Sequence, residues 1–504
     1  MKSSPRRVNK VLLIFPHIFE LKGNIMNLPP PLGVAYLAAV LERNGYTVKI
    51  LDLAAEDFNN REGIEDNLVM IGLSYKETEK RIIDFEPDMV GVSCLISSQY
   101  GDMLKLCELV KKIDKNIVTI VGGGHPSALP AQSLQCDNVD FVSIGESEYS
   151  LLSALQSLNS NRDVSHIDGF GYKQDGHIHI NPKTKFIENI DTIPFPARHL
   201  LPMETYFKMN IPQCGTSLKS PNTSILTSRG CPARCIYCAS SLFWGRKFRG
   251  RSPENVLQEM ESLIQLYGVK ELSIIDDNLT LDKERAMKLF QGMIDRRLNL
   301  VWNTPNGSAV WALDEELLSK MKEAGCYEVT LAVESGDQEV LTKIVKKPLR
   351  LSKVERLVAH AKGMGLLVKA FFMMGFPGET RAQMKKTIDF AKRLRFDAVG
   401  IFIATPLPGT ELYRICKDSG YLKRDFAFEK MSFAIGSIRT SHFTPEQLVS
   451  MRSRAVLQLN MRLLLRNPFR FYKKYSNLMF TNPKEIFELI FFLIRKTLHR
   501  GHSL

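Results

Sequence analysis

The sequence predicts an α/β protein with two successive domains, a doubly wound parallel sheet and a partial (β/α)6 barrel, followed by a helical carboxyl-terminal region. Three observations predict this architecture. Short apolar runs alternate with amphipathic helical patterns in two separate series, and a proline-stiffened segment lies between the series. After about residue 421 the alternation gives way to helical patterns alone. We therefore expect domains at 8–150, 223–421 and 422–504, with a linker at 151–222.

The first series predicts a Rossmann-like domain. Helical patterns at 32–43 and 102–113 separate apolar runs that read as strands. The strand candidates are 11–15, 47–53, 89–95, 117–123 and 141–145. Strands that alternate with helices at this spacing form a parallel sheet, and ligands bind beyond the carboxyl ends of its strands.

The linker has two recognisable parts. Residues 170–180 predict a hairpin that turns at Gln174-Asp175-Gly176. Residues 191–198 contain two prolines and are expected to be extended.

The second series contains six strand patterns, each followed by a helical pattern such as 254–266, 315–324 or 381–394. The strand candidates are 224–228, 271–276, 301–304, 328–333, 368–374 and 398–404. Six βα units in succession predict a partial barrel of the TIM type. Its chemistry is expected at the carboxyl ends of the strands.

Composition narrows the class of protein. Nine cysteines without regular spacing indicate a reducing, cytoplasmic setting rather than a disulfide scaffold. No apolar run reaches eighteen residues, and the first ten residues do not read as a signal peptide. The net charge of +13 is thinly spread apart from 466–504, where eight Lys or Arg face two Glu. A solvated surface explains that spread, and nucleic acid is not an expected partner.

Three cysteines, Cys231, Cys235 and Cys238, are clustered just after the first strand of the second series. Three thiolates on a tight loop can ligate three irons of a cubane cluster and leave the fourth iron open for an external ligand. The alternatives are chance clustering and a structural zinc site. Zinc requires four ligands, and Cys214 is the sole nearby candidate for the fourth.

The Cys-x-x-x-Cys-x-x-Cys spacing, with Tyr237 before the last cysteine, resembles the signature of radical S-adenosylmethionine enzymes. The resemblance spans about 222–421. It implies a 4Fe–4S cluster on the three cysteines that cleaves S-adenosylmethionine to methionine and a 5′-deoxyadenosyl radical. It also implies an external electron donor such as flavodoxin or ferredoxin. The cofactor contacts that it implies are Tyr237, Asn306, Glu334 and Ser335.

The first domain resembles the cobalamin-binding domains that precede the radical barrel in one subgroup of that family. The segments that carry this resemblance are 29–33, 122–126, 140–148 and 193–198. It implies contacts to cobalamin from Gly122, Gly123, His125, Gly145 and Glu146. An alternative for His125 is a capping or packing role.

This sequence departs from the subgroup's pattern in one motif. The Asp-x-His-x-x-Gly motif that supplies a histidine ligand to cobalt is absent, and His17 lies in the corresponding loop. Members without the motif bind cobalamin without that ligand. The alternative is a flavodoxin-like domain that has lost its ligand or binds another.

The leading hypothesis is cobalamin-dependent radical methylation of an unactivated carbon in a small-molecule substrate. A radical cyclase or oxidative rearrangement enzyme of tetrapyrrole or lipid biosynthesis is the alternative, and a non-enzymatic cobalamin sensor is an alternative of another class. No general acid or base is identified. A methylthiotransferase is not expected, because no cysteine precedes Cys94.

The carboxyl tail is apolar with basic ends. Residues 483–500 hold nine large apolar side chains flanked by Lys484, Arg495, Lys496 and Arg500. The segment is too short to span a bilayer. We expect it either to pack against the barrel or to lie at the inner membrane surface, and the second arrangement would suit a lipophilic substrate.

Overall fold

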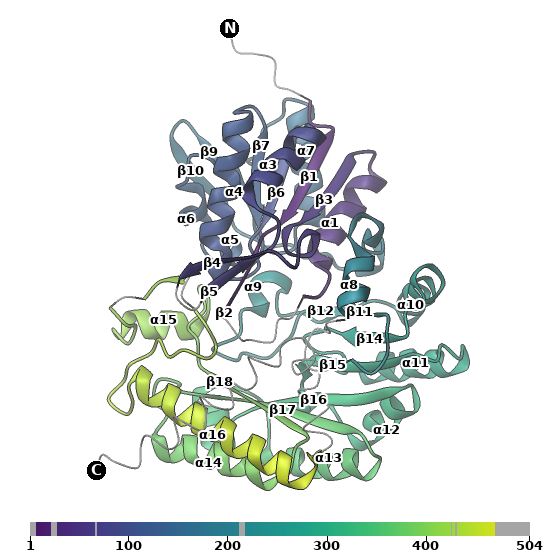
Figure 1. Ribbon diagram of the computed structural model, residues 1–504, viewed down its shortest axis with the longest axis vertical. Helices are drawn as coiled ribbons and strands as arrows, with labels where there is room; N and C mark the ends of the chain where they lie inside the picture. Colours follow the sequence, from purple (N-terminus) through teal and green to yellow (C-terminus); the bar gives the residue numbers. More distant parts are fainter. Residues whose placement is uncertain are drawn as a thin grey trace.

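The structure is a computed structural model that describes residues 7–21, 28–65, 68–210, 217–424, 426–428 and 431–468. The predicted tail segment at 483–500 and Cys214 lie outside these residues. Figure 1 shows the amino-terminal domain stacked on the barrel domain, with the short helix α9 (Ser240–Trp244) between them. No helix in the described part of the chain has the length and apolarity needed to cross a membrane.

The amino-terminal domain is built on a seven-stranded sheet of order β10-β9-β8-β7-β6-β1-β3. Its five parallel strands are β1 (Lys10–Phe15), β3 (Thr47–Asp52), β6 (Met89–Ser93), β7 (Val118–Gly122) and β8 (Phe141–Ser143). The parallel strands follow the 2-1-3-4-5 order of a doubly wound fold. The order reverses beside β1, so ligands are expected at the carboxyl ends of β1 and β6.

Both faces of this sheet are covered, which explains the continuous apolar runs. In β1, Val11 and Leu13 belong to one buried cluster, whereas Leu12 and Ile14 belong to the other. A strand buried on both faces cannot alternate polar and apolar residues. The main covering helices are α1 (Leu32–Arg43), α3 (Tyr75–Phe85), α4 (Tyr100–Ile113) and α7 (Glu148–Asn159).

The predicted hairpin belongs to this sheet rather than to a free linker. Strands β9 (Phe170–Gln174) and β10 (His177–Asn181) pair with each other, and β9 pairs antiparallel with β8. Helix α8 (Met203–Met209) also packs into the same core through Met203 and Tyr206. The amino-terminal core therefore extends about sixty residues beyond the predicted boundary at 150.

A small antiparallel sheet was not predicted. It consists of β2 (Ile18–Leu21), β5 (Leu68–Ile71) and β4 (Arg61–Glu65), in that order. In Figure 1 it lies at the lower edge of the amino-terminal domain, facing the barrel.

The barrel domain has six parallel strands in sequential order, β11-β14-β15-β16-β17-β18, so the predicted partial barrel is confirmed. The strands are β11 (Asn222–Ile225), β14 (Glu271–Ile274), β15 (Val301–Ser308), β16 (Cys326–Glu334), β17 (Leu367–Met374) and β18 (Ala398–Ile403). The main helices outside them are α10 (Pro253–Tyr267), α11 (Lys283–Asp295), α12 (Glu315–Glu323), α13 (Leu351–Gly363) and α14 (Arg381–Arg393).

Local sequence sets where these helices begin and end. Ser252 caps α10 by accepting from the Asn255 N–H, with Pro253 at the first helical position and Gly268 in left-handed conformation at the end. Thr380 and Gln383 form a capping box at the start of α14.

The carboxyl region covers one edge of the barrel. After α15 (Glu411–Asp418), the 22-residue helix α16 (Pro445–Arg466) packs along β18. Leu448 and Ala455 of α16 are part of the barrel core. A helical carboxyl region is thus confirmed up to Pro468, the last described residue.

Candidate functional site

The cysteine loop leaves the carboxyl end of the first barrel strand. A short strand, β12 (Ser228–Arg229), pairs antiparallel with β13 (Arg249–Gly250) and is followed by Gly230. Gly230 has φ +85, and a Cβ there would lie 2.2 Å from the Lys247 carbonyl oxygen. Only glycine fits this close approach in a left-handed conformation. Cys231, Cys235 and Cys238 follow at once, and α9 begins at Ser240.

The three thiols lie near one another, with Cys231 and Cys235 half-buried and Cys238 exposed. Desolvation raises the pKa of Cys235 to about 11 and that of Cys238 to about 12. Cys231 raises the pKa of both further. Burial also raises the pKa of Cys231. Within the described residues no three His, Cys, Asp or Glu side chains are arranged around a single metal ion. Thiolates of a cubane cluster each bind a different iron, whereas a structural zinc site needs four ligands around one ion.

Two acidic side chains just beyond β14, Asp276 and Asp277, form hydrogen bonds with residues on either side of the three cysteines. Asp276 accepts hydrogen bonds from the Thr227 N–H at 2.6 Å and from the hydroxyls of Thr227 and Ser228 at 2.5 Å. Asp277 accepts a hydrogen bond from the hydroxyl of Ser240, the first residue of α9. The loop is therefore fixed on both sides of the cysteines by the adjacent strand end.

Asn278, next in the chain, lies against the cysteine loop. Its side chain is 1% exposed, and its hydrogen bond to the Cys231 thiol lowers the pKa of that thiol against the larger rise that burial causes. Buried amides are nearly always partnered. Asn278 lies beside Cys231, so a group bound at the cysteines would reach it.

Glu334 forms the second centre of the site. It ends β16 in a left-handed conformation, φ +69, at a point where the register with β17 shifts. This strained geometry is uncommon for a non-glycine residue and is concentrated at functional sites. Glu334 Oε1 accepts from the Tyr237 hydroxyl at 2.7 Å and from Lys347 Nζ at 2.8 Å. Tyr237 thus connects the cysteine loop directly to Glu334.

Lys347 is a buried cation beside the cysteines. Its side chain is 4% exposed and lies over the Trp311 ring at 5.6 Å. Burial alone would lower the pKa of Lys347, but the charges of Glu334 and Cys235 raise it above its usual value. A fixed positive charge at this position complements an anionic cluster or a substrate carboxylate.

Two other predicted cofactor contacts, Asn306 and Ser335, lie in different surroundings. Asn306 is exposed at the end of β15, and its Nδ2 donates to the Ile275 carbonyl at 2.8 Å. Ser335, in contrast, is fully buried, and its hydroxyl lies 3.0 Å from Thr387 Oγ1 of α14 while accepting from the Asp337 N–H. Ser335 therefore holds the loop after β16 to α14, and its contact with a cofactor stays a prediction.

Apolar side chains are exposed at the switch point of the amino-terminal sheet. Leu95 and Ile96, just beyond β6, are 56% and 55% exposed. The neighbouring loop after β7 approaches closely, since a Cβ on Gly124 would lie 2.2 Å from the Leu95 carbonyl oxygen. An open apolar surface beside glycine loops fits a large flat ligand such as a corrin.

The predicted glycines all lie at this edge. Gly122 ends β7, Gly123 has φ +101, and Gly145 has φ +69 beyond β8. The Gly145 N–H donates to Ser127 Oγ at 2.8 Å. The structure thus brings Gly122, Gly123 and Gly145 together on the face that points toward the cysteine loop.

His17 and His125, two of the histidines of this domain, are buried. His17 Nδ1 lies 2.9 Å from an Asp102 oxygen and Nε2 lies 2.7 Å from the Leu73 carbonyl, so neither nitrogen is available to a metal. His125 is 1% exposed and packs on the Tyr100 ring at 4.2 Å, and burial lowers its pKa to about 4. The geometry favours the packing alternative for His125.

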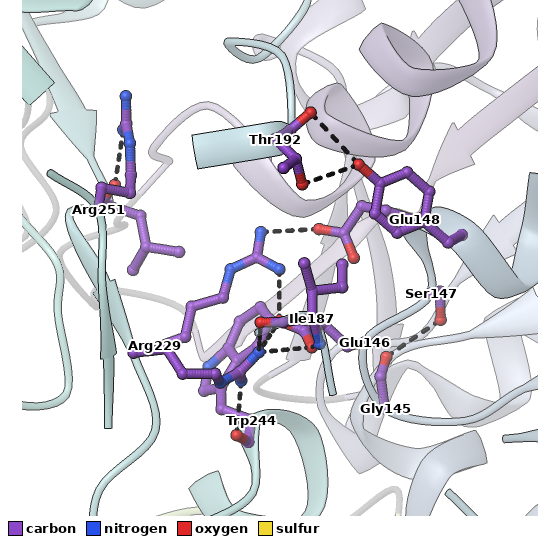
Figure 2. A network of polar contacts seen from close by, with 12 residues as sticks. Gly145, Glu146, Ser147, Glu148, Ile187, Thr192, Arg229, Trp244 and Arg251 are labelled. Atoms are coloured by element: carbon purple, nitrogen blue, oxygen red, sulfur yellow. Dashed lines mark hydrogen bonds and ion pairs between the residues drawn. The ribbon is translucent and has the colours of Figure 1, made fainter. Parts of the chain in front are cut away.

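Glu146 joins the two domains. Its carboxylate is fully buried and accepts from Arg229 at 2.7 Å and from Arg249 at 2.8 Å (Figure 2). Both oxygens are therefore used by arginines of the barrel domain. Glu146 is thus an interdomain ion-pair partner, and its contact with cobalamin stays a prediction.

Two functional candidates, Lys347 and Arg229, were not singled out from the sequence. Lys347 is one of several lysines in a charged segment, and only the fold brings it to Glu334. Arg229 lies two residues before Cys231, and this position beside the cysteine cluster could have identified it from the sequence.

Comparisons with known proteins agree with both halves of this site. A model of the B12 binding domain matches residues 21–155, and a model of the radical SAM superfamily matches residues 225–391. The first match lies within the amino-terminal domain, and the second contains the three cysteines, Glu334 and Lys347.

Similar proteins cover nearly the whole chain. Cytidylyl-2-hydroxyethylphosphonate methyltransferase of Streptomyces wedmorensis is 35% identical over 87% of both chains. An uncharacterized methyltransferase of Pyrococcus horikoshii is 32% identical over 90% of this chain and 93% of its own. An anaerobic magnesium-protoporphyrin IX monomethyl ester cyclase of Rubrivivax gelatinosus is 27% identical over 84% of this chain and 72% of its own.

A solved structure shows the same fold. The radical S-adenosylmethionine methyltransferase TsrM of Kitasatospora setae, with tryptophan and a S-adenosylmethionine analogue bound, superposes with a TM-score of 0.66 at 19% identity. The match covers 85% of this chain and 80% of TsrM.

Proposed function

This chain belongs to the cobalamin-dependent radical S-adenosylmethionine methyltransferases, and from this premise we propose how its residues hold the cofactors and where the substrate binds. One observation carries the proposal. The carboxyl ends of the two sheets face each other, and Arg229 of the cysteine loop reaches Glu146 and Glu148 of the opposite domain. A substrate between the sheets would be within reach of both cofactors.

We assign the 4Fe–4S cluster to Cys231, Cys235 and Cys238. Three thiolates leave one iron open for S-adenosylmethionine. When bound, the cluster and S-adenosylmethionine supply a radical that removes a hydrogen atom, and cobalamin supplies a methyl group. Reduction of the cluster requires an external one-electron donor of the flavodoxin or ferredoxin type.

Glu334, Tyr237, Lys347 and Asn306 orient S-adenosylmethionine in this proposal. Glu334 and Lys347 form a buried pair of opposite charges, and S-adenosylmethionine carries both an amino group and a carboxylate. Tyr237 transmits the position of the cysteine loop to Glu334 through its hydroxyl. Such preorganised charges lose little by reorientation when the ligand binds.

The glycine loops at Gly122–Gly124 and Gly145 hold cobalamin in this proposal, with Leu95 and Ile96 against its apolar face. The side chains of Leu95 and Ile96 are exposed. Once a ligand covers them, water is excluded from that part of the space between the domains. His17 makes no bond to cobalt, because Asp102 and Leu73 occupy both of its nitrogens.

The substrate is proposed at the level of class. The relatives named above act on chemically different compounds, a cytidylyl phosphonate and a protoporphyrin ester. What they share with this proposal is reaction at a carbon of a small molecule. The cyclase relative supports the alternative that the substrate radical closes a ring instead of receiving a methyl group.

Product analysis on the reconstituted protein tests the proposal. The protein is loaded anaerobically with iron, sulfide and hydroxocobalamin, and metabolite extracts are screened with S-adenosylmethionine that carries a deuterated methyl group. Methylation gives a product with the deuterated methyl mass shift, together with S-adenosylhomocysteine and 5′-deoxyadenosine. A converted substrate that yields 5′-deoxyadenosine and methionine without S-adenosylhomocysteine would support the cyclase instead. The Cys235→Ala variant is the control and is expected to form no 5′-deoxyadenosine.

We further propose that the carboxyl-terminal end of the molecule meets an anionic membrane surface. The last turns of α16 expose Met461, Leu464 and Leu465 by 54%, 42% and 81%. Beside them is a cavity of about 220 Å³ whose charged lining is mostly basic. Its charged residues are Lys362, Lys392, Arg395, Arg462, Arg466 and the single acid Asp397. Apolar side chains with a basic rim favour anionic interfaces.

Vesicle binding tests the membrane proposal. The full chain is expected to sediment with phosphatidylglycerol vesicles and to stay in solution with neutral phosphatidylcholine vesicles. Replacing Arg462 and Arg466 by glutamine should weaken binding about thirtyfold, since each of the two basic residues near the surface contributes about 1 kcal/mol. Equal binding of the full chain to both kinds of vesicle, or equal binding by a chain that ends at residue 468 and carries both glutamines, would contradict it.

A further inference from the structure

The loop that carries the three cysteines is attached at both ends to the amino-terminal domain. Arg229 precedes the loop, and α9 follows it. Each of these two attachments contacts the loops to which we assign cobalamin. The inference drawn here therefore rests on the proposed function.

Arg229 makes the first attachment, which Figure 2 shows from close by. Its Nη1 donates to Glu146 at 2.7 Å and its Nη2 donates to Glu148 at 2.7 Å, and its side chain is 3% exposed. Glu146 lies in the segment that joins β8 to α7, directly after Gly145, and Glu148 is the first residue of α7. The guanidinium also lies over the Trp244 ring at 4.5 Å. One arginine thus binds two residues of the opposite domain and the end of α9 together.

Arg249 completes the network. It lies on β13, opposite Arg229 in the two-stranded β12–β13 sheet. Its Nη1 donates to Glu146 at 2.8 Å and to the Ile187 carbonyl at 2.7 Å, and its Nη2 donates to the Trp244 carbonyl at 2.7 Å. Two arginines and two glutamates balance in charge, and all four side chains are at most 6% exposed.

Helix α9 makes the second attachment through close packing on glycines. A Cβ on Gly124 would lie 3.1 Å from Phe243 Cζ, and a Cβ on Gly145 would lie 3.2 Å from the Leu242 carbonyl oxygen. These are two of the glycine loops assigned to cobalamin. A shift of either loop would therefore move α9, which begins two residues after Cys238.

Buried ion pairs are a weak means of stabilisation, because desolvation offsets much of the Coulomb attraction. Their geometry is nevertheless strict, since a two-pronged arginine accepts only one arrangement of its carboxylates. We propose that Arg229, Glu146 and Glu148 are positioning residues that couple the occupancy of the cobalamin loops to the order of the cysteine loop. By reciprocity, each cofactor then stabilises the binding of the other.

Cluster loss measures this coupling without any substrate. The full-length protein is reconstituted with iron and sulfide, with or without hydroxocobalamin, and the rate at which a chelator removes the iron is followed anaerobically. For the unaltered chain, hydroxocobalamin is expected to slow iron loss about fivefold or more, the lower end of typical coupling between sites. In Glu148→Gln, which keeps the shape but removes one charge, that slowing should fall below about twofold.

Glu259→Gln is the matched control. Glu259 is also buried and also accepts from two arginines, Arg198 at 2.6 Å and Arg251, yet it lies on α10 and does not contact the cysteine loop. It is expected to keep the full effect of hydroxocobalamin. Arg229→Lys is the second test variant, since lysine retains the charge but cannot bind both carboxylates as a fork. It too should lose the effect.

The outcomes separate this inference from the proposed function. If the chain binds hydroxocobalamin but iron loss is unchanged, the coupling is wrong and the proposed function stands. If Glu148→Gln and Arg229→Lys respond to hydroxocobalamin as strongly as the unaltered chain, the coupling does not run through Arg229. If the chain binds no hydroxocobalamin, the proposed function and this inference both fail.

Discussion

Lys347 and Glu334 are the residue pair on which the site depends most directly. Each has at most 6% of its side chain exposed, and the two are 2.8 Å apart. Removing one partner of a buried pair leaves an uncompensated charge, which costs about 3–5 kcal/mol. Lys347→Met should therefore lower the thermal midpoint clearly and weaken S-adenosylmethionine binding, as measured by calorimetry on the reconstituted protein.

Lys343→Met is the control for this substitution. Lys343 is four residues away and pairs with Glu339 on the exposed surface. Exposed pairs contribute roughly 0–1 kcal/mol, so this variant should match the unaltered chain in both measurements. If Lys347→Met bound S-adenosylmethionine as tightly as Lys343→Met, Lys347 would have no part in that site.

His17 gives the amino-terminal domain a pH-dependent contribution to stability. Burial alone would lower the pKa of His17, but the hydrogen bond and charge of Asp102 raise it above the usual 6.5. The folded state therefore holds a proton that the unfolded state releases near pH 6.5. The contribution is complete below that pH and is lost as the pH rises through the raised pKa.

Urea unfolding between about pH 6 and pH 9 measures this dependence. The unaltered chain should lose stability across this interval, and His17→Gln should show a flatter profile over it. Equal slopes for the two proteins would mean that His17 is not protonated in the folded state.

Individual residues also show which parts of the site can be predicted from the sequence. The three cysteines and Tyr237 were visible because their chemistry depends on local spacing. Arg229 and Lys347 find their partners 83 and 13 positions away. Ser335 and Glu146 were chosen by motif, but the fold turns both side chains to protein partners. Motif position predicts proximity to a site better than it predicts the direction of a side chain.

Among the elements, the β12–Gly230 turn is the one most sensitive to a single methyl group. Gly230→Ala would place Cβ 2.2 Å from the Lys247 carbonyl oxygen, a contact that cannot be relieved without moving the cysteine loop. We expect this variant to fold but to take up little iron and sulfide after reconstitution. Chemical analysis of both, with the cluster absorbance, measures the effect.

Gly176→Ala separates backbone strain from this steric contact. Gly176 also has a positive φ, +76, but a Cβ there would meet nothing within 4 Å. It should cost about 1 kcal/mol of left-handed strain and load iron normally. Normal loading of Gly230→Ala would show that the loop can shift without losing the cluster site.

Elements with strong apolar periodicity were predicted well, and the exceptions have physical reasons. All six barrel strands and the five parallel strands of the amino-terminal sheet are found close to the expected ranges. The β2-β5-β4 sheet was missed because β4 reads Arg-Glu-Gly-Ile-Glu, which has little apolar content. The exposed strand β4 is held by its pairing with β5, whose Met70 and Ile71 are buried.

At the scale of the whole molecule, the amino-terminal domain is larger than its sequence pattern indicated. Phe170, Tyr172 and Tyr206 are buried in the same core as Val11 and Leu13. A fragment ending at residue 150 would lack these side chains and leave the edge of β8 unpaired. It should aggregate, whereas a fragment ending at residue 209 should be monomeric and folded.

Circular dichroism and size-exclusion chromatography compare the two fragments. Hydroxocobalamin binding by the longer fragment would add a functional readout. A folded, monomeric fragment 1–150 would contradict the extended boundary and restore the hairpin to a linker.

The attachment of the cysteine loop to the amino-terminal domain also has a consequence for biosynthesis. Domains generally fold in the order in which they are synthesised. The surface that supports Arg229 and α9 is therefore complete before the cysteines leave the ribosome, but β13 and its Arg249 emerge only afterwards. If iron arrived before β13 is synthesised, the cysteine loop would lack the support of Arg249. We expect cluster insertion to be a late, post-translational event in the maturation of this enzyme.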